Sequence, residues 1–394
     1  MKLSVFSIFR NIIFIIFFFC MQYEILICQS NEGKTTNQEI FLVIHNEENI
    51  SIEKNDFPVE TDDITIDSSK NEKESKYIPL SEFMYADNRR YTISGDLPLK
   101  DTEIKPLKAI AFGAGFTGVF IAQHLLQKNT LWDKLGEFRI KEDITQDLWA
   151  DKTDHIFDAY FASYLLSEVL LECGLSYDAA NVWGGVLGFT YLNYIEVLDG
   201  YGVNWGFSPS DFYANVAGAV YFVGQHYVPY LQNFTPKFMY IPAKWHGEEP
   251  RLPHSVFIDD YSSHTCWMSV NVHNILPESA KNYWPSWLQL SFGYAARNLF
   301  AYENYSYTPE LKEQNKKLIE KYARITEIKR DEVWGSPRYI IALDYDLAKI
   351  LPDNGSFWNW MRQTFAYLKL PSPAIEFSNR KPKYYLVYPF PLYN

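Results

Sequence analysis

The sequence reads DKTDH at residues 151–155, a lone Glu196, and SPSDFYANVAG at residues 208–218, three polar motifs within an otherwise apolar stretch. Around these motifs the apolar residues recur with helical spacing. Ser208 and its neighbours have the residue types that begin a helix, because their side-chain oxygens accept the first free backbone N–H groups. We expect helices at about residues 152–173, 180–198 and 211–230.

The polar residues of these motifs are expected to meet at one end of the helices. Asp151 and His155 are four residues apart and therefore lie on one helix face, and Asp211 and Asn215 repeat that spacing. Glu196 lies near the end of the helix between them. Consecutive helices joined by short loops run antiparallel, so the start of the first, the end of the second and the start of the third share one end of a bundle.

The sequence leaves three interpretations of this polar cluster open. In the first, His155 is a general acid or base oriented by Asp151 or Glu196, and Asp211 and Asn215 complete a catalytic pocket. In the second, the histidine and the carboxylates hold one divalent ion. In the third, which the positions at helix ends favour, the aspartates cap helices and the cluster only fixes helix packing. No cofactor is expected.

Composition limits the class of protein. The chain has 394 residues, of which 47% are hydrophobic and 17% aromatic, enough for one large domain with extensions or for two modest domains. The formal net charge of −12 and the lack of a basic stripe argue against a nucleic-acid partner. Once a leader is removed, Cys173 and Cys266 remain, too few for a disulfide framework, although they could form one bridge.

The N-terminus has the layout of a secretory signal peptide. Lys2 and Arg10 precede a long apolar run, and Ser30 is a suitable last residue before cleavage. An uncleaved anchor and a lipidated cysteine are the alternatives, but no small residue precedes either leader cysteine as a lipoprotein signal requires. We therefore expect an exported protein with a signal peptide at residues 1–30 and a disordered linker at residues 31–80.

Residues 108–128 form a nearly uncharged segment that is long enough to cross a bilayer. The alternative is a buried helix of a soluble bundle. Gly113, Gly115 and Gly118 would allow another helix to approach closely. Together with the three helices above, this segment predicts a membrane-associated domain of about four helices at residues 81–235.

After residue 236 the apolar residues alternate with period two, which indicates half-buried strands. The alternating segments are residues 267–272, 288–294, 339–347 and 383–390. A charged helix at residues 311–328 and an amphipathic helix at residues 356–370 are expected between the strands. The expected fold class is α+β, a membrane-associated helical bundle followed by a small antiparallel β-rich C-terminal region at residues 236–394.

The three polar motifs, Asp-Lys-x-x-His, then a glutamate, then Asp-x-x-x-Asn-x-x-Gly, also resemble those of a known family. DKTDH, Glu196 and SDFYANVAG are similar to the DUF2279 family of bacterial envelope proteins, which includes predicted periplasmic lipoproteins. The resemblance covers about residues 105–230, and the tail, with YIIALDYDLAKI at 339–350 and LPSPAIEF at 370–377, resembles the longer members found in Bacteroidetes. The same skeleton is similar to the VanZ-like membrane family. The resemblance implies a compartment and an architecture rather than a reaction.

These features together predict an exported cell-envelope protein, with the outer membrane or periplasm favoured over the inner membrane. We expect a structural or binding component at a membrane surface, with membrane lipid or other envelope components as its partners. The alternative is a membrane-associated enzyme that acts on a lipid-linked or cell-wall substrate. Its candidate catalytic residues would be His155, Asp151, Glu196, Asp211 and Asn215.

Overall fold

The computed structural model describes residues 76–129, 131–132, 134–144, 146–203, 205–248, 260–301, 328–330, 333–378 and 382–391. The expected signal peptide, nearly all of the expected linker and nearly all of the expected charged helix lie outside these described residues. Residues 75–394 form one compact unit. Within this unit the fold class is α+β, as predicted, and the boundary expected near residue 236 stays a prediction.

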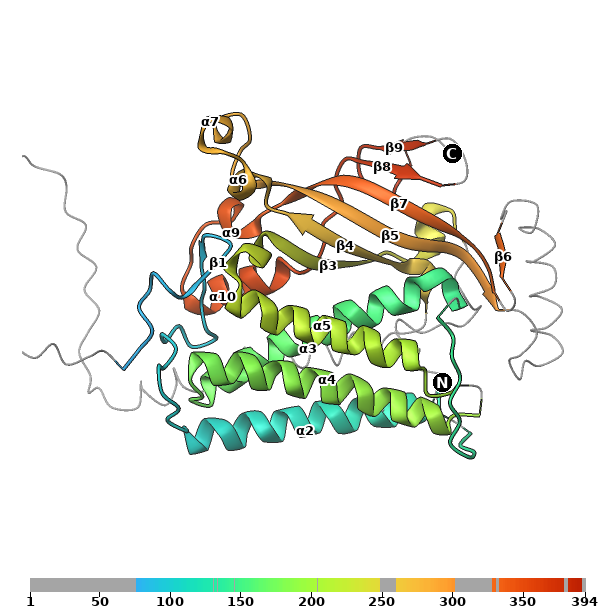
Figure 1. The fold of residues 1–394 in the computed structure, drawn as a ribbon, viewed down its shortest axis with the longest axis horizontal. Coiled ribbons are helices and arrows are strands. Elements are labelled where there is room, and N and C mark those ends of the chain that lie inside the picture. The colour runs from blue at the N-terminus through green and yellow to red at the C-terminus, as the bar shows by residue number, and fades with distance from the viewer. Residues whose placement is uncertain are drawn as a thin grey trace, which may run out of the picture. The chain divides into compact units, whose positions relative to one another are not determined.

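Four long helices make up the first part of the described fold: α2 (Pro106–Lys128), α3 (Ala150–Glu172), α4 (Tyr177–Tyr201) and α5 (Pro209–Tyr227). They agree with the predicted helices to within a few residues. Ser176 and Ser208 cap α4 and α5, where their hydroxyl oxygens accept the backbone N–H groups of Ala179 and Asp211. Figure 1 shows the sheet on one side of these helices and α2 on the side farthest from it.

Small residues allow α3 to pack tightly against α4 and α5. A Cβ atom built at Gly188 of α4 would lie 2.7 Å from the backbone nitrogen of Ser163 in α3. A Cβ atom built at Gly218 of α5 would lie 2.2 Å from the carbonyl oxygen of Ile156 in α3. Both distances are shorter than a carbon atom tolerates, so glycine at these positions sets how closely the helices approach.

An antiparallel sheet forms the second part of the described fold. Its strands are β3 (Phe234–Tyr240), β4 (His264–Val270), β5 (Leu288–Ala301), β6 (Ile328–Arg330), β7 (Val333–Tyr345), β8 (Ala374–Phe377) and β9 (Lys383–Tyr385). The strand order is β3-β4-β5-β7-β8-β9, and β6 pairs with β7 off this path. All of these pairs are antiparallel.

The alternating pattern predicted β4, β5, β7 and β9 but not β3, β6 and β8. Strand β3 contains Pro236 and Lys237, which weaken its apolar alternation, and β6 and β8 have only three and four residues. The expected helix at residues 356–370 is shorter than predicted, because α10 ends at Phe365. The predicted last strand, residues 383–390, is too long, because β9 ends at Tyr385. Sequence periodicity therefore found the segments that alternate clearly and missed strands whose sequences do not.

Short elements complete the described fold. They are β1 (Met84–Tyr85), β2 (Asn88–Arg89), η1 (Gln146–Trp149), η2 (Pro229–Asn233), η3 (Ala243–His246), η4 (Tyr261–Ser263), α6 (Val272–Ile275), α7 (Glu278–Lys281), α9 (Leu347–Ile350) and α10 (Ser356–Phe365). The β1–β2 hairpin connects the start of the described chain to the sheet end of the molecule, because Asn88 Nδ2 donates a hydrogen bond of 2.7 Å to Asp346 Oδ2.

Helix α3 joins the helical part to the sheet. Phe157 stacks on Phe238 of β3 with ring centroids 5.3 Å apart. Asp154, on the same side of α3, lies 2.5 Å from Nδ1 of His264 and accepts a hydrogen bond of 3.0 Å from the Cys266 thiol in β4. Cys266 and Cys173 are both free thiols, so the disulfide bridge considered above does not form.

Helix α2 is exposed over most of its length, so it is not buried among the other described helices. Among the described residues one segment, Pro106–Leu125, is long and apolar enough to cross a membrane, and none of it is buried. No atom lies within 4 Å of a Cβ built at Gly113, Gly115 or Gly118. No helix in the described part of the chain therefore approaches α2 at these glycines.

The contact between α3 and α5 gives a test of this packing. Gly218→Ala should lower the free energy of unfolding by about 1–3 kcal/mol, because the added methyl group forces the two helices apart. Gly113→Ala on α2 is the matched control, since its methyl group meets no atom and alanine favours a helix over glycine by about 1 kcal/mol. Thermal unfolding followed by circular dichroism measures both, and equal midpoints for the two variants would contradict this account of the helix contact.

Candidate functional site

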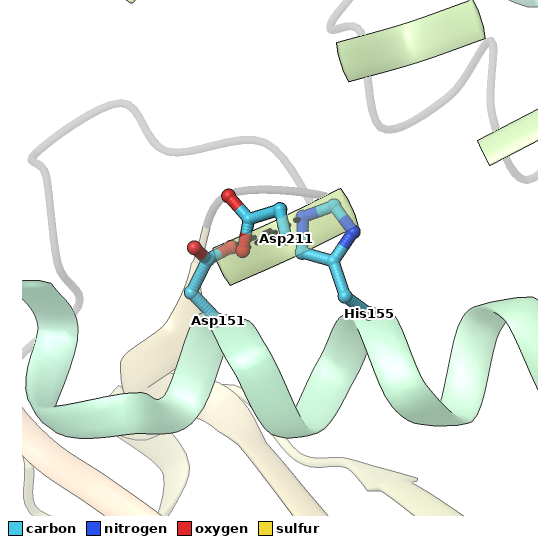
Figure 2. A group of neighbouring side chains, drawn as sticks. All are labelled: Asp151, His155 and Asp211. Atoms are coloured by element: carbon cyan, nitrogen blue, oxygen red, sulfur yellow. Dashed lines mark ion pairs between the residues drawn. The ribbon is translucent and has the colours of Figure 1, made fainter. Parts of the chain in front are cut away.

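The five candidate residues lie together at one end of the helices. Asp151 and His155 occupy the first turns of α3, Glu196 lies near the end of α4, and Asp211 and Asn215 lie at the start of α5. Four of the five side chains are buried and His155 is partly buried. Figure 2 shows Asp151 and His155 projecting from α3 toward Asp211.

His155 is surrounded by polar groups on both ring nitrogens. Its Nδ1 lies 3.1 Å from Oδ1 of Asn215. Its Nε2 lies 3.5 Å from Asp151 Oδ1, 3.4 Å from Glu196 Oε1 and 3.8 Å from Asp211 Oδ1. The imidazole therefore stands between an amide and three carboxylates, as the antiparallel arrangement of the helices predicts.

Lys152 is a second centre of the cluster. Its Nζ lies 2.5 Å from Asp143 Oδ1, 2.7 Å from Asp151 Oδ2 and 2.5 Å from Asp211 Oδ1. Burial favours a neutral lysine, but Asp151, Asp211 and Asp143 overcome that effect and raise the pKa of Lys152. The ammonium group is held charged by ion pairs with three carboxylates, and it donates hydrogen bonds to Asp143 and Asp151.

Two further residues of the cluster were not predicted from the sequence. Asp143 lies in the loop before α3, where its Oδ1 accepts a hydrogen bond of 2.7 Å from the hydroxyl group of Ser208. The Tyr261 hydroxyl group, from η4, donates a hydrogen bond of 2.6 Å to Asp151 Oδ1. The only signal for Asp143 was its place among charged residues just before the motif, and Tyr261 is 110 positions from its partner.

The cluster lines a pocket of about 440 Å³ that includes its open mouth. Asp143, Asp151, His155, Glu196 and Asp211 all contribute to its wall. The remaining wall residues are Lys141, Asp147, Asp199, Trp205, Gly206 and Tyr261. Small solutes can therefore reach polar groups that are otherwise buried among the helix ends.

Carboxylates outnumber cations in this pocket, and the pKa values reflect it. Burial, followed by the charge of Asp151, raises the pKa of Asp211 to about 7. Burial also raises the pKa of Glu196 to about 9 against the opposing effect of His155. Burial alone would lower the pKa of His155, but Asp211, Asp151 and Glu196 raise it well above its usual value. Without another cation, the cluster balances its negative charge by holding protons.

The same charge balance limits the chemistry that the cluster can perform. Because the surrounding carboxylates favour the protonated imidazole, without another cation His155 is better suited to donate a proton than to accept one. Asp151 behaves in the opposite way: burial opposes its ionisation, but Lys152 and His155 outweigh that effect and hold its pKa well below the usual range. Asp151, His155 and Asp211 each offer an atom that could bind a metal ion, and these atoms lie within 4.8 Å of one another.

A second pocket, of about 610 Å³, was not predicted from the sequence. It lies at the opposite end of α3 and α5, where Tyr85 of β1 contacts Tyr160 and Gln225. Arg90 extends into its wall and pairs with Glu168 at 2.5 Å. Segments far apart in the sequence form this pocket, so no local motif could have indicated it.

Comparison with known proteins gives one match. The family model for DUF2279, described as a predicted periplasmic lipoprotein, matches residues 140–224. The matched segment contains Asp143, Lys152 and all five predicted candidate residues, although it is shorter than the range of 105–230 expected from the motifs. The comparison gives no support for the VanZ-like pattern. No curated protein and no solved structure matches the chain.

Removal of the buried ammonium group tests what holds the cluster together. Lys152→Met should lower the free energy of unfolding by about 3–5 kcal/mol, because it leaves Asp143, Asp151 and Asp211 buried without their cation. Lys76→Met is the matched control: Lys76 pairs with Glu103 at 3.0 Å on the exposed surface, and exposed ion pairs contribute little. Urea unfolding in the presence of a chelator compares the two, and a loss as small as that of the control would show that Lys152 is dispensable.

Proposed function

We propose, from the membership of residues 140–224 in the DUF2279 family of predicted periplasmic lipoproteins, that this chain docks on a lipid bilayer as a structural or binding component of the cell envelope. The family supports an exported, cell-envelope location and gives no preference between the outer and the inner membrane. The finer proposal concerns the surface that meets the lipid. It consists of α2 and of the outer faces of α4 and α5.

The exposure of α2 is the observation that carries this proposal. Between Lys108 and Lys128 the helix contains no Asp, Glu, Lys or Arg. Its apolar side chains nevertheless face outward, with Leu107 84% exposed, Ile110 69% and Ile121 51%. In water such a surface would be costly, at about 25 cal/mol for each Å² of apolar area. A soluble protein rarely exposes so continuous an apolar surface.

Helices α4 and α5 extend the same kind of surface. In α4, no Asp, Glu, Lys or Arg lies between Asp178 and Glu196. In α5, Asp211 in the first turn is the one residue of these four types. Their exposed large apolar residues are Trp183, Val186, Leu187, Val197, Tyr201, Tyr213, Val220 and Tyr227. Helix α3, which packs between these helices and the sheet, has most of its charged residues buried, although Asp158 is exposed. In α4 and α5 the Asp, Glu, Lys and Arg residues are therefore confined to the helix ends.

Lipid explains this distribution better than a protein partner does. A protein interface covers one face of a helix, whereas α2 is exposed around most of its circumference and contacts α4 through aromatic pairs such as Phe120 with Tyr194, 4.8 Å between ring centroids. Acyl chains can surround a helix on all remaining sides. We therefore name a bilayer as the occupant of this surface.

An enzyme at the membrane surface is the second candidate function. The observation that favours it is the place of the pocket, at the end of the apolar helices. Trp132, which follows α2, donates a hydrogen bond of 2.6 Å to Asp199 in the pocket wall. A polar pocket beside an apolar surface suits a substrate with a polar head and a lipid tail. This candidate ranks second because it rests on the place of the pocket alone.

Binding to liposomes tests the proposal. Ile121→Lys should reduce flotation of the full-length protein with phosphatidylethanolamine–phosphatidylglycerol vesicles at least tenfold, because a lysine within the apolar layer costs about 3 kcal/mol. Tyr283→Lys is the control: this aromatic residue is 88% exposed and follows α7 closely in the sequence. Figure 1 shows α7 on the side of the sheet away from α2.

The two variants also distinguish the competing occupants of the surface. Equal flotation of Ile121→Lys and the unaltered protein would overturn the assignment of α2 to lipid. Loss of flotation with Tyr283→Lys alone would move the lipid contact to the aromatic loops of the C-terminal region. A wild-type dimer that Ile121→Lys converts to a monomer, with no flotation of either, would replace lipid with a second copy of the chain.

A further inference from the structure

We propose that Asp151, His155 and Asp211 bind one divalent transition-metal ion, and that Zn²⁺ suits this set of donors best. The proposal is independent of membrane docking, because it rests on the inner ends of the helices and not on their outer faces. It assigns a ligand to a cluster that packing alone would leave as a set of buried charges.

The spacing of the donor atoms fits a central ion. Charge-assisted hydrogen bonds between a histidine and a carboxylate are about 2.7–2.9 Å long. The three carboxylate oxygens lie 3.4, 3.5 and 3.8 Å from His155 Nε2, too far for such bonds. Four ligands placed tetrahedrally about 2.1 Å from zinc are separated from one another by about 3.4 Å. The separations of Asp151 and Asp211 from the imidazole nitrogen, 3.5 and 3.8 Å, are close to that value, and the donor atoms of these three residues lie within 4.8 Å of one another.

The histidine is oriented to offer a lone pair to that ion. The amide oxygen of Asn215, which can only accept, lies 3.1 Å from His155 Nδ1, so Nδ1 carries the proton in the neutral ring. Nε2 is then the unprotonated nitrogen, and it faces the three carboxylates. A hydrogen bond to the other ring nitrogen is the usual way in which proteins fix a metal-binding histidine. Asn215 is fully buried and can hold this orientation.

Other donors hold the carboxylates in place around the histidine. Tyr261 donates to Asp151 Oδ1, and the backbone N–H of Ser208 donates to Glu196 Oε2 at 3.4 Å, so that Glu196 Oε1 faces the histidine. Asp211 gives an independent indication of a ligand. Its side chain is 6% exposed, and its Oδ1 has an ion-pair contact with Lys152 but no hydrogen bond of normal geometry. That oxygen points into the cluster.

The net negative charge of the pocket also favours binding of a divalent cation. Asp143, Asp151, Glu196 and Asp211 face one lysine, so the pocket retains negative charge after Lys152 is counted. A divalent ion would offset most of what remains. One imidazole with carboxylates favours Zn²⁺ or a neighbouring first-row ion over Ca²⁺ or Mg²⁺, which prefer oxygen ligands alone.

Titration of the full-length protein with ZnCl₂, after dialysis against a chelator, tests the proposal directly. Isothermal calorimetry should detect one Zn²⁺ ion per chain. His155→Gln and Asp211→Asn, which nearly preserve side-chain size, should each weaken binding at least a hundredfold, since each removes a ligand. Asn215→Ala should weaken binding about 10–100-fold, as expected of a residue that positions a ligand.

His226→Gln is the matched control. His226 Nε2 lies 2.7 Å from Asp178 Oδ1, so this pair is a histidine–carboxylate contact on the same helices but outside the cluster. The control should bind Zn²⁺ as tightly as the unaltered protein does. Equal weakening by His226→Gln and His155→Gln would overturn the assignment, and so would the absence of stoichiometric Zn²⁺ binding by the wild type.

Cobalt gives a readout that does not depend on how well the variants fold. Co²⁺ added to the wild-type protein should produce the intense visible absorption of a tetrahedral site, and Zn²⁺ should abolish it by displacement. The weak spectrum of octahedral Co²⁺, unchanged by Zn²⁺, would contradict the proposed geometry. Tighter binding of Mg²⁺ than of Zn²⁺ would contradict the choice of ion.

Discussion

One buried ammonium group, that of Lys152, stabilises the arrangement of the helix ends. It lies within 2.7 Å of carboxylates from the loop before α3, from α3 itself and from α5. Three buried carboxylates would repel one another strongly in a region of low dielectric constant. Because Lys152 offsets that repulsion, the starts of α3 and α5 can meet, and the close contact at Gly218 can form. The pocket, the orientation of His155 and the polar environment of Glu196 all follow from this meeting.

Local sequence rules were sufficient to predict the centre of the cluster. Asp151 and His155 share a helix face, Asp211 and Asn215 share another, and short loops between helices bring these faces to one end. Asp143 and Tyr261 could not be found in this way, because neither lies on one of the three helices. Tyr261 reaches Asp151 only after the chain has turned from the helices into the sheet. Its position depends on tertiary packing that no periodic pattern encodes.

The fold class could also be predicted from local patterns, whereas some of its details depend on tertiary contacts and were missed. Strands β5 and β7 are long and alternate clearly, so that their period was visible. Strand β8 has four residues and is a strand because it pairs with β7 and β9. The environment of α2 could not be predicted from the sequence either, because an apolar helix has the same composition whether protein or lipid surrounds it. The structure adds that the neighbours of α2 among the described residues lie on one side of the helix.

The contact of Asp154 with β4 has a consequence for how this chain is divided. The segment shared with the family ends at residue 224, yet Asp154 within that segment has its partners, His264 and Cys266, beyond the end of it. A chain that ended at residue 224 would therefore lack both partners, and the face of α3 that packs on β3 and β4 would be open to water. The segment that the family model matches is thus smaller than the unit that packs together in this structure.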